Sequence, residues 1–182
     1  SIIIFINALN MYDGINLQVG SYCIIILLTL MYFSNLDLIL LILIMSLITF
    51  LYLNYKSIIF LGDSGTYLLG FIISYLIIYT AKIDNYYLLS ADKIFIIMLL
   101  PGLDLIRLFI IRLRNKKHPF SSDRNHVHHI IEKSLGYNKT ILYLITFSAL
   151  SNLLMILFSD NLILIIFLFF IIYSISVKHY EK

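Results

Sequence analysis

The sequence has 182 residues, of which 61% are hydrophobic and 13% are charged, with a formal net charge of +3. A soluble globular domain carries about 25% charged residues, so this composition argues against a water-soluble fold. The apolar residues occur in long runs and not in short alternating segments, which predicts an all-α, polytopic transmembrane helical bundle.

The apolar runs predict an N-terminal helix stub at residues 2–6 and about six membrane spans, all within a single membrane domain, 1–182. A span needs roughly 20 residues, with a lower limit near 17, and the runs reach this length when their polar-flanked ends are included. Pro101 interrupts the fourth run. The six predicted spans cover residues 19–33, 38–53, 67–81, 94–111, 141–158 and 162–177.

Basic residues set the predicted orientation of the chain in the membrane. The polar loop at about 112–140 is rich in Lys and Arg, and the positive-inside rule therefore makes it cytoplasmic. Alternation along the chain places the loops at about 7–18 and 54–66 on the same side. These three segments carry most of the catalytic-type side chains. We therefore expect one composite site at the cytoplasmic face of the cell (inner) membrane.

The tetrapeptide Gly62-Asp63-Ser64-Gly65 places a carboxylate between two glycines at the edge of a predicted span. Glycines allow close backbone approach, and a carboxylate suits Mg²⁺ when substrate phosphates complete the metal's shell. Taken alone, the tetrapeptide is better explained by a turn in which Asp63 caps the following helix.

Asn7, Asn10 and Asp13 recur at intervals of three residues. On a helix the two asparagines share one face and Asp13 lies within reach of it. Amides and a carboxylate at a cytoplasmic helix end suit a nucleotide or a sugar. On these residues alone, an interfacial loop with Asn caps and an Asp-Gly turn is the favoured interpretation.

Three histidines, His126, His128 and His129, follow Arg124 in the polar segment. Their spacing does not form one helical face, so phosphate contacts from a bent loop are favoured over a zinc tripod. Imidazole and guanidinium groups are donors suited to phosphate oxygens. A basic loop that holds anionic lipid headgroups explains the Lys and Arg residues at 112–117, but it does not require three clustered histidines.

Asp104 and Arg107 are three residues apart in the predicted span 94–111. Ionisable groups at membrane depth are costly and face protein or a cavity. An ion pair between the two residues and a role in lining the site explain them equally well.

Together, the three polar segments resemble the polyprenyl-phosphate N-acetylhexosamine-1-phosphate transferases, which are glycosyltransferase family 4. Residues 7–14, Asn-Ala-Leu-Asn-Met-Tyr-Asp-Gly, are similar to the family's Asn-x-x-Asn-x-x-Asp-Gly. Residues 60–65, Phe-Leu-Gly-Asp-Ser-Gly, are similar to its Phe-Met-Gly-Asp-x-Gly. Residues 119–129 are similar to Pro-Phe-x-x-Asp-Arg-x-His-x-His-His, the signature of the WecA- and TagO-like branch, and more distantly to MraY.

The resemblance implies transfer of N-acetylhexosamine-1-phosphate from a UDP-sugar to polyprenyl (undecaprenyl) phosphate, with release of UMP. This reaction is the first membrane step of cell-envelope glycan synthesis. The implied partners are UDP-N-acetylhexosamine, polyprenyl phosphate and the bilayer, without nucleic acid, and a homodimer is left open. The implied cofactor is Mg²⁺, with Mn²⁺ as the alternative. The implied residues are Asp63, His126, His128 and His129 for catalysis, Asn7, Asn10, Asp13, Phe60 and Arg124 for substrate binding, and Asp63 and Asp13 for the metal.

The chain departs from the family pattern in two places. It contains no adjacent Asp-Asp pair, and the family has such a pair before the asparagine motif. We therefore expect this chain to be the C-terminal portion of a longer transferase and to be inactive alone. In addition, Leu17 and Gln18 stand where many members have Gly-Leu.

Two other classes of protein remain as alternatives: a transporter with Asp104 and Arg107 on its path, and a catalytically inactive membrane scaffold. The clustering of ionisable residues at one face favours an interfacial enzyme.

Overall fold

The computed structural model describes residues 2–81, 89–118 and 125–180, and within these ranges the chain is helical with no strand. This confirms the all-α class predicted from composition. The elements, in chain order, are α1 (Ile2–Tyr12), α2 (Gln18–Phe33), α3 (Asp37–Tyr55), α4 (Gly62–Ala81), α5 (Ala91–Ile97), α6 (Leu99–Arg114), α7 (Val127–Leu135), α8 (Tyr137–Leu157), the short 3₁₀ helix η2 (Ser159–Asn161) and α9 (Leu162–Tyr180).

The helix lengths correct the predicted number of membrane spans. Among the described helices, α3, α4, α8 and α9 with η2 are long and apolar enough to cross a membrane, and the bent pair α5–α6 brings the number to five. The expected sixth span is α2, which has only 16 residues. A helix of that length is about 24 Å long, which is shorter than the roughly 30 Å hydrocarbon core of a bilayer.

Apolar side chains cover the outer faces of α3 and α9. Among these side chains, Leu38, Ile42, Ile163, Leu164 and Phe167 are 60–74% exposed. In water such faces would promote aggregation, whereas lipid tails solvate them without loss. The exposed surface therefore fits a multi-pass membrane protein. Within the helices the backbone N–H and C=O groups bond to one another, as they must in hydrocarbon, which offers them no hydrogen-bond partner.

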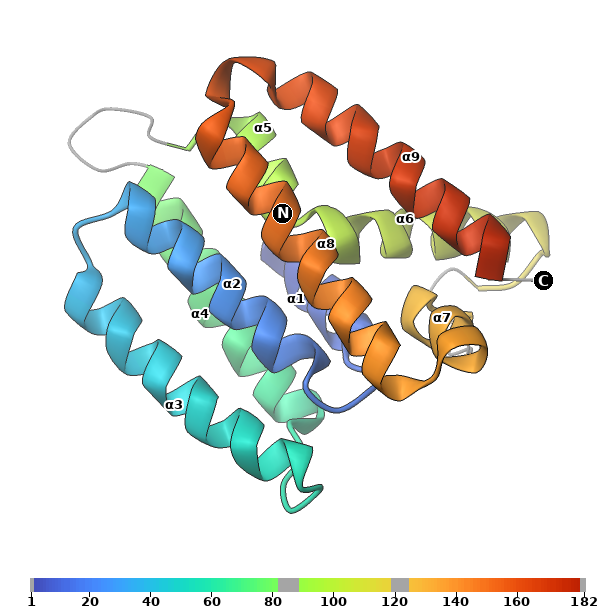
Figure 1. The fold of residues 1–182 in the computed structure, drawn as a ribbon, viewed down its shortest axis with the longest axis horizontal. Helices are drawn as coiled ribbons and strands as arrows, with labels where there is room; N and C mark the ends of the chain where they lie inside the picture. Colours follow the sequence, from blue (N-terminus) through green and yellow to red (C-terminus); the bar gives the residue numbers. More distant parts are fainter. Residues whose placement is uncertain (1, 82–88, 119–124, 181–182) are drawn as a thin grey trace.

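The loops that carry the sequence motifs gather at one end of the bundle. In Figure 1 the α1–α2 loop, the α3–α4 loop and α7 lie at the lower end, whereas the α2–α3 loop and η2 lie at the opposite end. The Asn16 side chain donates to Ser57 Oγ at 3.1 Å, and the Tyr137 hydroxyl donates to the Asn16 carbonyl at 3.1 Å. The predicted convergence of three segments on one side is therefore observed.

Two of the predicted loops are partly helical. The stub expected at 2–6 extends to Tyr12, so Asn7 and Asn10 lie on α1 and Asp13 follows its end. The segment expected as a loop at 112–140 contains the whole of α7. The histidines therefore lie at the start of a helix and not in a bent loop.

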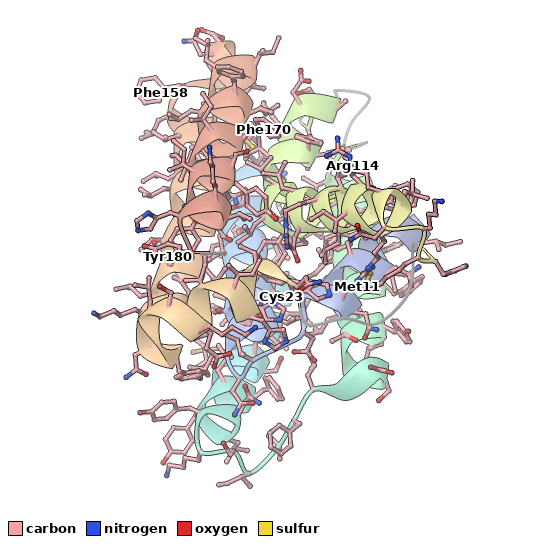
Figure 2. The ribbon with its side chains drawn as sticks, turned by 90° about the vertical axis from the view of Figure 1, so that its right-hand side faces the viewer. Met11, Cys23, Arg114, Phe158, Phe170 and Tyr180 are labelled. Atoms are coloured by element: carbon pink, nitrogen blue, oxygen red, sulfur yellow. The ribbon has the colours of Figure 1, made fainter. Side chains whose placement is uncertain are left out.

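The predicted span 94–111 is sharply bent. Helices α5 and α6 meet at an angle of 81°, and Figure 2 shows α6 lying across the direction of α8 and α9. The cause is Pro101, which has no N–H to donate to the carbonyl of Ile97 four residues earlier and whose ring crowds that carbonyl. The hydroxyl of Tyr22, on α2, donates to the Ile97 carbonyl instead, at 2.8 Å.

Removing the Tyr22 hydroxyl is expected to destabilise the bundle. Tyr22→Phe leaves the buried Ile97 carbonyl without this donor, so the free energy of unfolding in detergent micelles should fall by about 1 kcal/mol. Tyr32, on the same helix but 65% exposed, provides the matched control Tyr32→Phe. Equal stability of the two variants would contradict the role assigned to the Tyr22 hydroxyl.

Candidate functional site

A pocket of about 410 Å³ opens at the end of the bundle where the motif loops meet. The α1–α2 loop, including Asp13, lines one side of it, and the residues that lead into α4, including Phe60 and Asp63, line the other. The Phe60 side chain is 69% exposed and offers an aromatic face at the pocket. Two of the three predicted polar segments therefore share one cavity.

Asp13 and Asp63 form a pair of carboxylates at this pocket. Burial and, to a smaller extent, the negative charge of Asp63 together raise the pKa of Asp13 to about 6. A divalent cation bound between two such carboxylates would offset the repulsion between their charges. Within the part of the chain that the structure describes, no group of three or more His, Cys, Asp or Glu residues can hold a metal. Two carboxylates suit an ion such as Mg²⁺, which takes few protein ligands and completes its shell with water and phosphate.

The backbone at Gly62 directs Asp63 into the first turn of α4. Gly62 has φ +64°, a left-handed conformation that glycine adopts without strain. Asp63 is exposed, and no hydrogen bond joins its carboxylate to another described residue. The structure thus places Asp63 in the first turn of α4, but its carboxylate does not make the hydrogen bond that the capping interpretation expects and is available to a ligand.

Asn10 connects the first motif to the second. Thr66 Oγ1, on α4, donates to Asn10 Oδ1 at 2.5 Å, and Asn10 Nδ2 donates to the Tyr67 hydroxyl at 3.4 Å. Asn10 therefore fixes α1 against α4 beside the pocket. Asn7 is not brought to this pocket, because it lines a separate, apolar one between α1 and α6.

Asn54, which the sequence reasoning missed, shapes the α1–α2 loop. It is 4% exposed at the end of α3, and its Oδ1 accepts from the N–H of Leu17 at 2.7 Å. Its Nδ2 donates to the carbonyl of Ile59 at 2.9 Å. Leu17 has φ +70°, the left-handed region that a glycine would occupy more easily. The sequence signal that could have identified Asn54 is its position as an amide at the end of the apolar run 38–53.

His128 connects the first motif to the third. Its Nδ1 accepts from Gln18 Nε2 at 3.2 Å, and Gln18 Oε1 accepts from the N–H of Gly14 at 3.4 Å. A Cβ atom on Gly14 would lie 1.8 Å from His128 Nε2, so only glycine allows this approach. Gln18, which stands where many family members have leucine, therefore connects the first motif to the third.

His128 is neutral in this position. Burial is the main cause, and the neighbouring His129 and His126 add to it; together they lower the pKa of His128 to about 3. Because an amide Nε2 is a donor only, Nδ1 of His128 must accept, and its ring proton lies on Nε2. His128 is thus a neutral, buried side chain.

The other two histidines lie next to His128. The His126 and His128 rings are stacked with centroids 5.4 Å apart, and the His128 and His129 centroids are 4.2 Å apart. His126 Nδ1 lies 2.8 Å from Asp104 Oδ2, and His129 Nδ1 lies 3.8 Å from Glu132 Oε2. Arg124, the fourth predicted member of this group, lies outside the described residues.

Asp104 and Arg107 agree with the first of the two sequence interpretations, the ion pair, and their role in lining a site stays a prediction. They form an ion pair at 2.9 Å, and Asp104 also contacts His126. Arg112 was expected to contact lipid headgroups from an exposed loop, but its side chain is buried, at 2% exposure. The bend before α6 turns this residue inward, toward the apolar pocket beside α1.

Comparison with known proteins agrees with the motifs. Residues 1–81 match the family described as Glycosyl transferase family 4. The chain is 37% identical over 98 residues to the undecaprenyl-phosphate alpha-N-acetylglucosaminyl 1-phosphate transferase of Thermotoga maritima, covering 53% of this chain and 31% of the relative. It is 31% identical over 91 residues to the protein of that name in Escherichia coli K12, covering 50% of this chain and 24% of the relative.

A third relative, of the same name and from Pasteurella multocida, is 33% identical over 91 residues, covering 50% of this chain and 25% of the relative. The matches cover less than one third of the length of each of these three relatives. No solved structure matches the chain. Over residues 1–81 the chain is thus similar to glycosyl transferase family 4, and over about half of its length it is similar to these transferases.

Proposed function

We propose that the protein carrying this chain transfers N-acetylhexosamine-1-phosphate from a UDP-sugar to polyprenyl phosphate and releases UMP. The observation that carries the proposal is the meeting of three sequence-distant motifs at one end of the bundle. Asp13 and Asp63 share a pocket, and His128 touches the glycine that follows Asp13. The site faces the cytoplasm in this proposal, because the basic segment at 112–140 favours that side.

The pocket suits the nucleotide-sugar donor. Phe60, whose aromatic face is exposed, is proposed to stack on uracil, and Asp13 and Asp63 are proposed to hold Mg²⁺, or Mn²⁺ in its place. When bound, the ion offsets the negative charge that develops on the diphosphate oxygens. An oxygen of the lipid phosphate forms a bond to the sugar-linked phosphorus, the bond from that phosphorus to UMP breaks, and UMP leaves with the electron pair.

The histidine group suits the phosphates. Arg124 and His129 are proposed as donors to phosphate oxygens. His126 is proposed to meet the reacting phosphates through the ring nitrogen that does not contact Asp104. Neutral His128 supports the group by fixing the backbone of the first motif. Asn10 acts on substrate indirectly, by fixing α1 against α4.

The lipid acceptor fits the second pocket. This cavity of about 250 Å³ between α1 and α6 has walls of Ile, Leu, Met and Phe side chains, and Asn7 and the buried Arg112 also line it. Hydrocarbon walls with a guanidinium suit a polyprenyl chain that ends in a phosphate. Asn7 then contributes to acceptor binding, not to nucleotide binding.

The family's Asp-Asp pair would come from outside this chain, and a homodimer is compatible with the proposal. A transporter is disfavoured, because Asp104 and Arg107 are engaged with each other and with neighbouring side chains.

Asp63→Asn is expected to lower UMP release by roughly 10²-fold or more, because it removes a metal-binding charge. The measurement uses the complete protein in membranes, with labelled UDP-N-acetylhexosamine, polyprenyl phosphate and Mg²⁺. Asp37→Asn, at the opposite end of the bundle, is the matched control and should retain activity. Full activity of Asp63→Asn would show that the metal assignment is wrong.

The pH dependence of Mg²⁺ activation should follow Asp13. Its pKa of about 6 means that the carboxylate binds a proton, and loses its charge for the metal, as the pH falls through 6. The Mg²⁺ concentration for half-maximal UMP release should therefore rise between pH 7.5 and pH 5.5. Asp13→Asn should need more Mg²⁺ at every pH and show a flatter dependence. An unchanged slope in this variant would exclude Asp13 as the titrating ligand.

Gly14→Ala should uncouple the first and third motifs, because the added Cβ would overlap His128. A displacement of about 1 Å in a catalytic group lowers the rate by on the order of 10²-fold. Gly102→Ala is the control, since nothing lies within 4 Å of a Cβ at that position. The assay is UMP release at equal amounts of folded protein. Activity of Gly14→Ala equal to that of Gly102→Ala would refute the coupling.

A further inference from the structure

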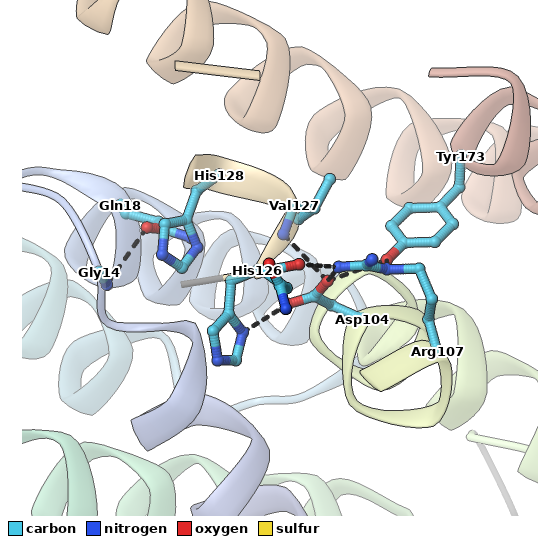
Figure 3. A network of polar contacts seen from close by, with 9 residues as sticks. Gly14, Gln18, Asp104, Arg107, His126, Val127, His128 and Tyr173 are labelled. Carbon is cyan, nitrogen blue, oxygen red and sulfur yellow. Dashed lines mark hydrogen bonds and ion pairs between the residues drawn. The ribbon is translucent and has the colours of Figure 1, made fainter. Parts of the chain in front are cut away.

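We propose that Asp104 and Tyr173 are positioning residues that fix the ring orientation and tautomer of His126. Both side chains are buried, at 2% and 3% exposure, and they come from helices that carry none of the three motifs. Figure 3 shows them converging with Arg107 on the residue that begins the histidine group. The catalytic part of this inference rests on the proposed function, whereas its structural part does not.

The Asp104 carboxylate accepts four hydrogen bonds. Oδ1 accepts from Arg107 Nη2 at 2.9 Å, from the Tyr173 hydroxyl at 2.9 Å and from the N–H of Val127 at 3.0 Å. Oδ2 lies 2.8 Å from His126 Nδ1. A buried carboxylate is retained where such donors satisfy its oxygens. Asp104 is therefore the centre of a closed polar network between α6, α7 and α9.

The direction of each hydrogen bond follows from the donors available. Arg107 Nε donates to the Tyr173 oxygen at 2.9 Å, so the single Tyr173 proton is directed to Asp104. With Oδ1 occupied by three donors, Oδ2 is the acceptor left for the imidazole. An ionised carboxylate only accepts, so His126 must carry its proton on Nδ1. Nε2 is then the atom that exchanges a proton or a hydrogen bond with a phosphate.

The same network holds the backbone on both sides of His126. Arg107 Nη2 donates to the carbonyl of Asn125, and Asp104 Oδ1 accepts from the N–H of Val127. His126 is thus held by its preceding carbonyl, its following N–H and its ring. His126 precedes α7 and its side chain makes no capping hydrogen bond, so Asp104 satisfies the first N–H of that helix instead.

Asp104→Asn is a sharp test because it keeps the shape of the side chain. Three donors meet at the Oδ1 position, so the asparagine oxygen must lie there, and the amide nitrogen must face His126. That nitrogen donates, so Nδ1 of His126 becomes the acceptor and its proton moves to Nε2. The substitution should therefore invert the tautomer without removing the residue.

The experiment uses the complete protein in lipid nanodiscs with ¹⁵N-labelled imidazole rings. Long-range ¹H–¹⁵N spectra report which ring nitrogen carries the proton, and His126→Gln assigns the signals. We expect a protonated Nδ1 in the wild type and a protonated Nε2 in Asp104→Asn. In the UMP assay, kcat of Asp104→Asn should fall roughly 10²- to 10⁴-fold, as for other histidines held in the wrong tautomer. KM for the UDP-sugar should change less than about twofold, as expected for an interaction that acts only in the transition state.

Tyr173→Phe tests the network independently of Asp104→Asn. It removes one donor to Oδ1 and the acceptor of Arg107 Nε, and it preserves the ring. We expect a shifted His126 Nδ1 proton resonance and a kcat lower by roughly threefold to tenfold, at unchanged KM. Asp92→Asn, an exposed carboxylate on α5, is the matched control and should change neither readout.

The outcomes separate this inference from the proposed function. An unchanged tautomer together with unchanged kcat in Asp104→Asn would overturn the positioning role, and so would equal effects in Asp92→Asn. If Asp104→Asn does not fold, Tyr173→Phe with a wild-type spectrum and kcat would overturn it. If the wild type releases no UMP, the proposed function fails, while the ring spectra still decide whether Asp104 sets the tautomer.

Discussion

Hydrogen bonds between polar side chains far apart in the sequence hold together the end of the bundle that carries the site. Thr66 donates to Asn10, Gln18 to His128, and Asn54 accepts from the loop between α1 and α2. In hydrocarbon, apolar faces of helices gain little by choosing one another over lipid. Directional bonds of this kind therefore determine which helix ends meet, and the carboxylates and imidazoles depend on them for their placement.

The bend at Pro101 extends this network into the second half of the chain. A straight span at 94–111 would keep Asp104 and Arg107 on the axis of a membrane helix. The turn of 81° lays α6 across the bundle, beside the start of α7 and the middle of α9. One missing N–H, compensated by Tyr22, thus allows Asp104 to reach His126 and Arg107 to reach the carbonyl of Asn125. The same bend buries Arg112 beside α1.

Composition and charge predicted the helical class and the common side of the motifs, because both follow from the solvation of long apolar runs. They did not predict the shortness of α2 or the direction of α6, which depend on packing and on one proline. Asp63 was predicted from its two flanking glycines, and Asp13 from its spacing to Asn7 and Asn10. Asn54, Gln18 and Tyr173 were missed, because their roles arise only from contacts between distant segments.

Leu17 shows how strongly the first motif depends on its surroundings. Its left-handed backbone costs about 1 kcal/mol relative to a glycine, and the hydrogen bond from its N–H to Asn54 contributes a similar amount. The turn after Asp13 is therefore not an autonomous local structure. It exists only while α3 lies beside α2, so the loop that carries Asp13 and that helix pair open and close as one cooperative unit.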